Sequence, residues 1–285
     1  MTSFGGHEKL IARIGELTKL PAGTPASSDL ADVVESLLSQ LEAGTIRAAE
    51  RDAHGRWVAV PWVKQGILLA FRFGAMTDYP AGDVFSFIDK NTIPPRRFDV
   101  NAGVRIVPGG STIRRGTYVA SGVVCMPPMF VNVGAWVGEG TMVDSHALVG
   151  SCAQVGARVH ISAGAQIGGV LEPVNASPVV LEDDVIVGGN CGVYEGTVVR
   201  ARAVLAAGVV LTRGTPVYDL VKKTVYRGGI GAPLEIPDGA VVVPGARHVK
   251  TAWTTDHGIS IQTPVIVKYR DDKTDLATAL EDLLR

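Results

Sequence analysis

The fold is decided by a six-residue repeat that is clearest in residues 131–156, which read VNVGAWVGEGTMVDSHALVGSCAQVG. An aliphatic residue occupies every sixth position of this stretch, and the same spacing continues in both directions. A first ladder runs from Val107 to Ile167, in which Cys125 stands where every other member is Val or Ile. A second ladder of Val and Leu runs from Leu181 to Val217. The residue four places after each aliphatic is usually small or β-branched, which suits the inside of a narrow apolar column.

This repeat predicts a mainly β fold, a parallel β-helix in which each hexad supplies one short strand and one turn. The aliphatic residues would point inward and form a continuous apolar shaft as the coils stack. Glycine, 34 of 285 residues, fits turns that need a left-handed backbone. Three hexads per coil would give about six coils, roughly 29 Å tall at 4.8 Å between strands. An alternating-strand sandwich would have a period of two and is not supported. The pattern leaves the handedness of the coil open.

The segments that flank the ladders lack the repeat, so we expect three parts. Residues 1–100 form an N-terminal helical domain, 101–217 the β-helix, and 218–285 a small C-terminal extension. In the first part, Ser28 and Asp29 are expected to cap a helix that ends near Gly44, and a second helix covers 62–71. Between the ladders, 171–178 break the register and are expected to leave the coil as a loop. Strands at 240–243 and 264–269 and a helix at 274–284 are expected near the C-terminus.

Composition and charge exclude several classes of protein. Hydrophobic residues make up 46% of the chain, which is too many for an intrinsically disordered protein. Lysine and arginine number 27 against 28 acidic residues, so no basic field favours nucleic acid as a partner. No apolar run reaches the ~18 residues of a membrane span, and the N-terminus lacks a signal-peptide pattern. The three cysteines, Cys125, Cys152 and Cys191, are predicted to be buried thiols of a cytoplasmic protein.

Several strings carry a resemblance to a known family. They are GTMVD at 140–144, GSCAQVG at 150–156, IGGVLEP at 167–173, and, before the repeat, GTIRAAE at 44–50 and WVKQGILLAFR at 62–72. On these residues the chain resembles the left-handed parallel β-helix acyltransferases and, more narrowly, the tetrahydrodipicolinate N-succinyltransferase family of lysine and diaminopimelate biosynthesis. The resemblance implies a left-handed coil and a homotrimer with active sites between subunits. It also implies that the succinyl group of succinyl-CoA, the co-substrate, is moved to the nitrogen of hydrated tetrahydrodipicolinate, giving N-succinyl-2-amino-6-oxopimelate.

Acyl transfer to an amine needs a base, donors for the oxyanion and, for a dicarboxylate substrate, cations. Asp144 follows the inward Val143, where a carboxylate most often caps its own turn. The resemblance instead implies that Asp144 binds the substrate and orients or deprotonates its nitrogen. Arg105 precedes the first coil, where an arginine is usually a solvated rim residue, but the resemblance implies a grip on a substrate carboxylate.

At the second carboxylate the sequence departs from the pattern that the resemblance implies. The family carries a catalytic glutamate where this chain has Gly192, and Glu195 lies three residues later. Either Glu195 takes over that role or this chain uses one carboxylate fewer. Asp144 and Glu195 are seven or eight hexads apart, and neither number divides by three. They are therefore predicted to lie on different sides of one coil and to converge only across a subunit interface. Glu172, in the segment that breaks the repeat, is either a substrate-binding candidate or a solvated loop carboxylate.

Candidates for coenzyme binding follow from the resemblance and from charge. Ala206 and Gly208 are small residues along one coil edge, where a pantetheine arm would lie close to backbone amides. Arg213 and Lys222 are cations near the end of the coil, available either to the coenzyme phosphates or only to solvent. Gly245 stands where the family has a tight turn near the coenzyme.

Three alternatives remain open at this point. The first is an N-acetyltransferase acting on the same substrate. The second is a sugar-nucleotide acyltransferase, which would use His146 or His160 as its base. The third is a catalytically empty β-helix scaffold, or a carbonic-anhydrase-like zinc protein with two histidines five residues apart. His146 and His160 are fourteen residues apart, so no metal is expected.

Overall fold

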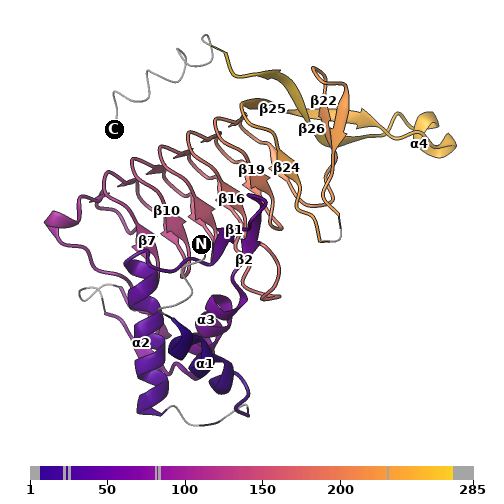
Figure 1. The fold of residues 1–285 in the computed structure, drawn as a ribbon. Helices are drawn as coiled ribbons and strands as arrows, with labels where there is room; N and C mark the ends of the chain where they lie inside the picture. The colour runs from indigo at the N-terminus through magenta and orange to yellow at the C-terminus, as the bar shows by residue number, and fades with distance from the viewer. Residues whose placement is uncertain are drawn as a thin grey trace.

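The computed structural model describes residues 7–21, 24, 27–80, 82, 85–229 and 231–271 of the chain. A cluster of helices at the N-terminal end leads into a stack of triangular coils, and a long β-hairpin projects beyond the last coils (Figure 1). The helix expected at 274–284 lies outside the described residues.

The coils form a parallel β-helix in which each strand from β5 to β18 pairs with the strand three places later, which confirms the fold prediction. We name its three faces after β10, β11 and β12. The β10 face contains β7 (Tyr118–Val119), β10 (Trp136–Val137), β13 (Gln154–Val155), β16 (Val180–Leu181), β19 (Val198–Val199) and β24 (Glu235–Ile236). The β11 face contains β5 (Arg105–Ile106), β8 (Val124–Cys125), β11 (Met142–Val143), β14 (His160–Ile161), β17 (Ile186–Val187) and β20 (Val204–Leu205). The β12 face contains β6 (Thr112–Ile113), β9 (Phe130–Val131), β12 (Leu148–Val149), β15 (Gln166–Ile167), β18 (Gly192–Val193) and β21 (Val210–Leu211).

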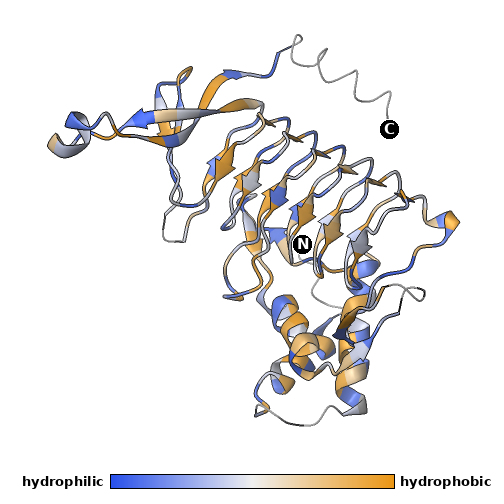
Figure 2. Cartoon of the chain, turned by 180° about the vertical axis from the view of Figure 1, so that it is seen from behind, coloured by the Kyte–Doolittle hydropathy of each residue, from blue (hydrophilic) through white to orange (hydrophobic). Residues whose placement is uncertain are grey.

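The second residue of each two-residue strand points into the shaft, and the first points outward. Val137 is fully buried, while Trp136 faces out and stands in register with Gln154 of the next coil. The small residues four places later, such as Ala147 and Ala153, are also buried in the same core. Hydrophobic residues recur in the strands from coil to coil (Figure 2). The aliphatic ladders of the sequence are therefore the core of the coil.

The faces meet at three corners, which we name by the two faces that they join. In the central coil, 138–141 form the β10/β11 corner, 144–147 the β11/β12 corner, and 150–153 the β12/β10 corner. The corners pack against each other along the axis. At Gly150, a Cβ atom would lie 2.1 Å from the backbone nitrogen of Gly169. A side chain at this position would push two coils apart.

We expect Gly150→Ala to lower the free energy of unfolding by about 2–4 kcal/mol, because backbone atoms cannot yield as a flexible side chain does. Gly214→Ala is the matched control, since no heavy atom lies within 4 Å of a Cβ at Gly214. That control should change stability by less than about 1 kcal/mol. Urea unfolding of both variants measures the difference, and equal midpoints would contradict this account of the corner.

The predicted break in the repeat is a loop of residues 168–179 at the β12/β10 corner. Strand pairing resumes in register after it, because Gln154 pairs with Val180 just as Trp136 pairs with Gln154. The loop is tied to the helical part by Lys64, whose side chain is buried and whose ammonium donates a hydrogen bond to the Ala176 carbonyl. Desolvation lowers the pKa of Lys64.

The N-terminal part contains α1 (Glu8–Leu17), α2 (Ser28–Glu42) and α3 (Pro61–Phe73), which share an apolar core. It also contains the hairpins β1 (Ala49–Arg51)–β2 (Trp57–Ala59) and β3 (Met76–Asp78)–β4 (Ile88–Lys90), and the 3₁₀ turn η2 (Val100–Ala102). The helix core includes Val133 and Cys152, so the helices pack on the β12/β10 corner. The predicted cap of α2 is wrong by one residue: Ser27 caps it and accepts a hydrogen bond from the Leu30 amide. α1 and the β3–β4 hairpin were not predicted.

The C-terminal part extends the β11 face. It contains β22 (Val217–Asp219), β23 (Thr224–Tyr226), β25 (Ala240–His248), α4 (Ala252–Asp256) and β26 (Ser260–Tyr269). β25 pairs with β20 and then forms a long antiparallel hairpin with β26, which carries α4 near its tip (Figure 1). The predicted strands 240–243 and 264–269 are too short. In the sequence Pro244 and Pro264 indicate strand ends, but both strands continue past them. The two prolines face each other in the hairpin instead.

Among the described residues, no helix has the length and apolar character needed to cross a membrane.

Candidate functional site

Asp144 lies at the β11/β12 corner, directly after β11, and is partly exposed. One of its carboxylate oxygens accepts a hydrogen bond from the Ser145 amide at 2.7 Å. His146, two residues on, has a φ of 62° and donates its amide to the Pro128 carbonyl. The carboxylate is therefore held by its own turn at the surface of the coil. It has both the turn role expected from the pattern and the exposure needed to reach a bound molecule.

Three coenzyme candidates lie together on the same corner, three coils further along the axis, which is about 14 Å. The amide of Ala206 donates to the Val242 carbonyl at 2.8 Å, which places β25 against this corner. A Cβ atom at Gly208 would lie 3.9 Å from Pro244, next to Gly245. Ala206, Gly208 and Gly245 thus form one strip of small residues at the end of the corner that carries Asp144.

Two of the predicted cations lie elsewhere. Arg105 is exposed on the outer side of the β11 face, in register with Val124 and then Met142, so it lies two coils from Asp144. Lys222 lies in the turn between β22 and β23, with its ammonium 4.2 Å from the centre of the Tyr269 ring. Neither cation contacts Asp144 within one chain.

The remaining candidates gather at the β12/β10 corner. A carboxylate oxygen of Glu195 accepts the Arg213 amide at 3.1 Å, and both residues line a pocket of about 280 Å³. The 168–179 loop, through Asn175 and Ser177, forms another wall of that pocket. Glu172 is exposed in the same loop. The structure therefore brings Glu195, Arg213 and the loop of Glu172 together.

Asp144 and Glu195 flank opposite edges of the β12 face, as the hexad count predicts. They are also two coils apart, about 10 Å along the axis. An aromatic ring occupies the place where the resemblance implies a glutamate: a Cβ atom at Gly192 would lie 2.4 Å from a ring carbon of Tyr194 and 2.9 Å from its hydroxyl. A larger residue at Gly192 would have to displace Tyr194.

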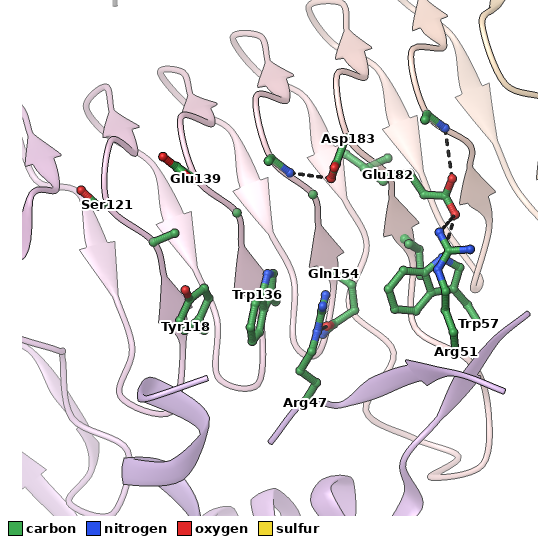
Figure 3. A pocket seen from close by; sticks show the side chains of 17 residues that line it. Arg47, Arg51, Trp57, Tyr118, Ser121, Trp136, Glu139, Gln154, Glu182 and Asp183 are labelled. Atoms are coloured by element: carbon green, nitrogen blue, oxygen red, sulfur yellow. Dashed lines mark hydrogen bonds and ion pairs between the residues drawn. The ribbon is translucent and has the colours of Figure 1, made fainter. Parts of the chain in front are cut away.

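A cavity of about 650 Å³ lies over the β10 face, between its outward side chains and the β1–β2 hairpin (Figure 3). Tyr118, Trp136 and Gln154 stand on successive coils of its floor, and the Tyr118 and Trp136 rings stack with centroids 3.8 Å apart. The guanidinium of Arg47 lies 3.9 Å from the Trp136 ring centroid. We did not predict this cavity. The outward residues recur at the spacing of one coil, which is a signal that could have revealed its floor.

The three cysteines are buried, as predicted, and none of them forms a disulfide within the described part of the chain. Burial raises the pKa of Cys125 and of Cys152 to about 12 and also raises the pKa of Cys191. Only about one in 10⁴ of the Cys125 or Cys152 thiols is then ionised at pH 8.

We expect the native protein at pH 8 to react very slowly with a chromogenic disulfide reagent, and the denatured chain to release three equivalents at once. Rapid labelling of any one cysteine in the native protein would contradict the buried placement. The same property would leave little background from the protein in any assay that detects free thiols.

Comparison with known proteins identifies relatives over nearly the whole chain. A family model for the tetrahydrodipicolinate N-succinyltransferase N-terminal region matches residues 16–73, and a model for the hexapeptide repeat of succinyl-transferase matches residues 178–213. A 2,3,4,5-tetrahydropyridine-2,6-dicarboxylate N-succinyltransferase of Nitrobacter winogradskyi is 43% identical over 268 residues, 92% of each chain. One from Polynucleobacter asymbioticus is 40% identical over 272 residues, 93% of this chain and 92% of the relative.

A solved structure shares the fold. It is a Campylobacter jejuni protein provisionally described as a 2,3,4,5-tetrahydropyridine-2-carboxylate N-succinyltransferase, with a TM-score of 0.53 and 17% identity. The similarity covers 85% of this chain and 64% of that one.

Proposed function

Because the chain belongs to the tetrahydrodipicolinate N-succinyltransferase family, we propose that it transfers the succinyl group of succinyl-CoA to the nitrogen of tetrahydrodipicolinate. The observation that carries this proposal is the identity of 40–43% over at least 90% of the chain with succinyltransferases of this substrate. The product would be N-succinyl-2-amino-6-oxopimelate, in the diaminopimelate route to lysine, and the proposed compartment of the reaction is the cytoplasm.

Asp144 is the proposed base. Water first adds across the C=N bond of the cyclic imine, so the nitrogen of the hydrated substrate carries a proton. This nitrogen attacks the thioester carbonyl, the new C–N bond forms and the C–S bond breaks; the nitrogen proton passes to the Asp144 carboxylate, which returns it to the departing thiolate of CoA. The ring C–N bond of the carbinol then breaks and its hydroxyl proton moves to nitrogen, which opens the ring and gives the 6-oxo group. The hydrogen bond from the Ser145 amide holds the Asp144 carboxylate, so the side chain already has its rotamer before the substrate binds. No covalent intermediate on the protein is needed, because the thioester is already activated.

The coenzyme is proposed to lie along the strip of Ala206, Gly208 and Gly245, which shares the corner of Asp144. Small residues let a pantetheine arm approach the backbone. Arg213 and Lys222 are the proposed partners of its phosphates, since both are cations near the end of the coil. Arg105 is proposed to hold a substrate carboxylate.

The site is proposed to be completed by a second subunit of a homotrimer. Asp144 and Glu195 lie on opposite edges of the β12 face, so a single chain does not bring them to one substrate. Glu195, with Glu172 nearby, is proposed to come from the neighbouring subunit. The outward side of the β11 face carries Val124, Met142, Ile186 and Val204 beside the polar Arg105 and His160. Its apolar residues are proposed to pack between subunits.

The test is thiol release from succinyl-CoA and from acetyl-CoA, each with and without freshly generated tetrahydrodipicolinate. We expect release that requires both succinyl-CoA and tetrahydrodipicolinate. Release with acetyl-CoA alone would assign the chain to acetyl transfer, and no release with either donor would overturn the proposed reaction. The variant carrying both His146→Ala and His160→Ala is expected to remain active, which separates this reaction from histidine-based acyl transfer to a sugar nucleotide.

A further inference from the structure

The cavity over the β10 face contains a half-buried cation that has no anionic partner among the described residues. One N–H group of Arg47 donates to the Gln154 side chain at 2.9 Å. Among the residues that the structure describes, the other four N–H groups of this guanidinium have no hydrogen-bond acceptor, and no carboxylate lies within ion-pair distance. Desolvation lowers the pKa of Arg47 to about 10, so the side chain stays charged at neutral pH.

The guanidinium is held rigidly where it lines the cavity. It lies 3.9 Å from the centroid of Trp136 and 5.4 Å from that of Trp57, which face it from the β10 face and from β2 (Figure 3). Trp57 is fixed in turn, because its indole N–H donates to Glu182 at 2.9 Å. A cation fixed in this way needs little reorganisation to bind a carboxylate through two parallel hydrogen bonds.

The carboxylates of the cavity lie at two places, one next to arginines and two at the exposed corner. Glu182 is already paired, with Arg51 at 2.8 Å and Arg200 at 2.9 Å. Glu139 and Asp183 are exposed at the β10/β11 corner above the floor, where Asp183 accepts a hydrogen bond from the Ala157 amide at 2.9 Å and lies 4.0 Å from the guanidinium of Arg158. Counting all charged lining residues, the cavity has two arginines against three carboxylates. Glu182 is balanced by Arg51 and Arg200, so the exposed carboxylates of Glu139 and Asp183 would repel a phosphate dianion, whereas a zwitterion would be attracted at both ends.

We propose that this cavity is a binding site for a free α-amino acid, distinct from the acyl-transfer site. The ligand carboxylate would bind the free N–H groups of Arg47, and its ammonium would face Glu139 and Asp183. Its side chain would lie against the rings of Trp57 and Tyr118. The volume of about 650 Å³ is ample for such a ligand. The proposal does not rest on the proposed acyl transfer.

Isothermal titration of the full chain tests the proposal with glycine, L-leucine and L-lysine as probes. Acetate, ethylammonium and inorganic phosphate each carry charge of only one sign, and they serve as comparison ligands that we call the separated charges. We expect at least one of the three amino acids to bind at millimolar concentrations, and each separated charge to bind at least tenfold more weakly than that amino acid. Binding should be unchanged in Asp144→Ala, because the acyl-transfer corner is a different surface.

Two variants locate the binding. Arg47→Gln should lose at least tenfold in affinity, and Glu139→Gln, an exposed change that should leave the fold intact, should lose about threefold. Asp238→Asn, an exposed carboxylate outside the cavity, is the matched control and should bind as the unmodified chain does. If Arg47→Gln does not fold, the test is the affinity of Glu139→Gln for the amino acid compared with that of Asp238→Asn. Absence of binding by all three amino acids, or binding unaffected by these cavity variants, would overturn the proposal.

Discussion

Replacing Asp144 by Ala is expected to lower succinyl-CoA-dependent turnover by about 10²–10⁴-fold, the usual contribution of a general base. The fold should tolerate the change, because among the described residues the side chain makes a single hydrogen bond, which it accepts from the Ser145 amide at 2.7 Å. Loss of that bond costs about 1 kcal/mol. Thiol release and the midpoint of urea unfolding, measured on the same preparation, separate the two effects.

Asp144→Asn makes the test sharper. The amide oxygen of asparagine still accepts the Ser145 N–H, so the turn is preserved while the base is removed. We therefore expect Asp144→Asn to be as inactive as Asp144→Ala but nearly as stable as the unmodified chain. Asp238→Ala, at another exposed turn, controls for the change in net charge. If Asp144→Asn kept its activity, Asp144 would be only the turn carboxylate that its sequence position first indicates.

Recovery of activity in a mixture of two mutant chains tests whether the site is shared between subunits. We expect Asp144→Asn and Glu195→Gln to be inactive alone, and a mixture of the two chains, refolded together, to regain roughly a quarter of the full activity. A site that takes Asp144 from one subunit and Glu195 from the next is intact only when the two mutant chains meet in the right order. Random assembly produces that order at about one site in four.

Glutamine at position 195 retains an acceptor for the Arg213 amide, so this change also spares the local hydrogen bond. Light scattering of each variant checks that the assembly is intact. If the mixture showed no recovery while both variants assembled, the two carboxylates would not act across an interface. If Glu195→Gln alone remained fully active, Glu195 would not be the second carboxylate.

The parts of this structure that were predictable are those in which every coil imposes the same requirement. Each hexad needs one aliphatic residue inside the coil. Val137, Val155 and their equivalents therefore predict the apolar shaft from the sequence alone, without knowledge of tertiary contacts. The separation of Asp144 and Glu195 was predictable for the same reason, because a position in a three-sided coil follows from counting hexads.

The parts that were missed depend on contacts that no local period records. The β10-face cavity exists because β1 and β2 dock beside the coil, and Arg47 is a single residue with no repeat to mark it. The hairpin of β25 and β26 was predicted too short because Pro244 and Pro264 usually end strands. A two-stranded ribbon has open edges, where a residue without an N–H group is tolerated. The ring of Tyr194 over Gly192 likewise becomes visible only in three dimensions.

The loop of residues 168–179 leaves the pairing of Gln154 with Val180 unchanged, and this has a consequence for how such a protein varies. The faces of the coil accept almost no change in length, since one extra residue would turn inward side chains outward. A corner accepts several extra residues at no cost to the register beyond it. New binding surfaces are therefore acquired by lengthening corners, and the shaft can persist unaltered beneath them while specificity diverges.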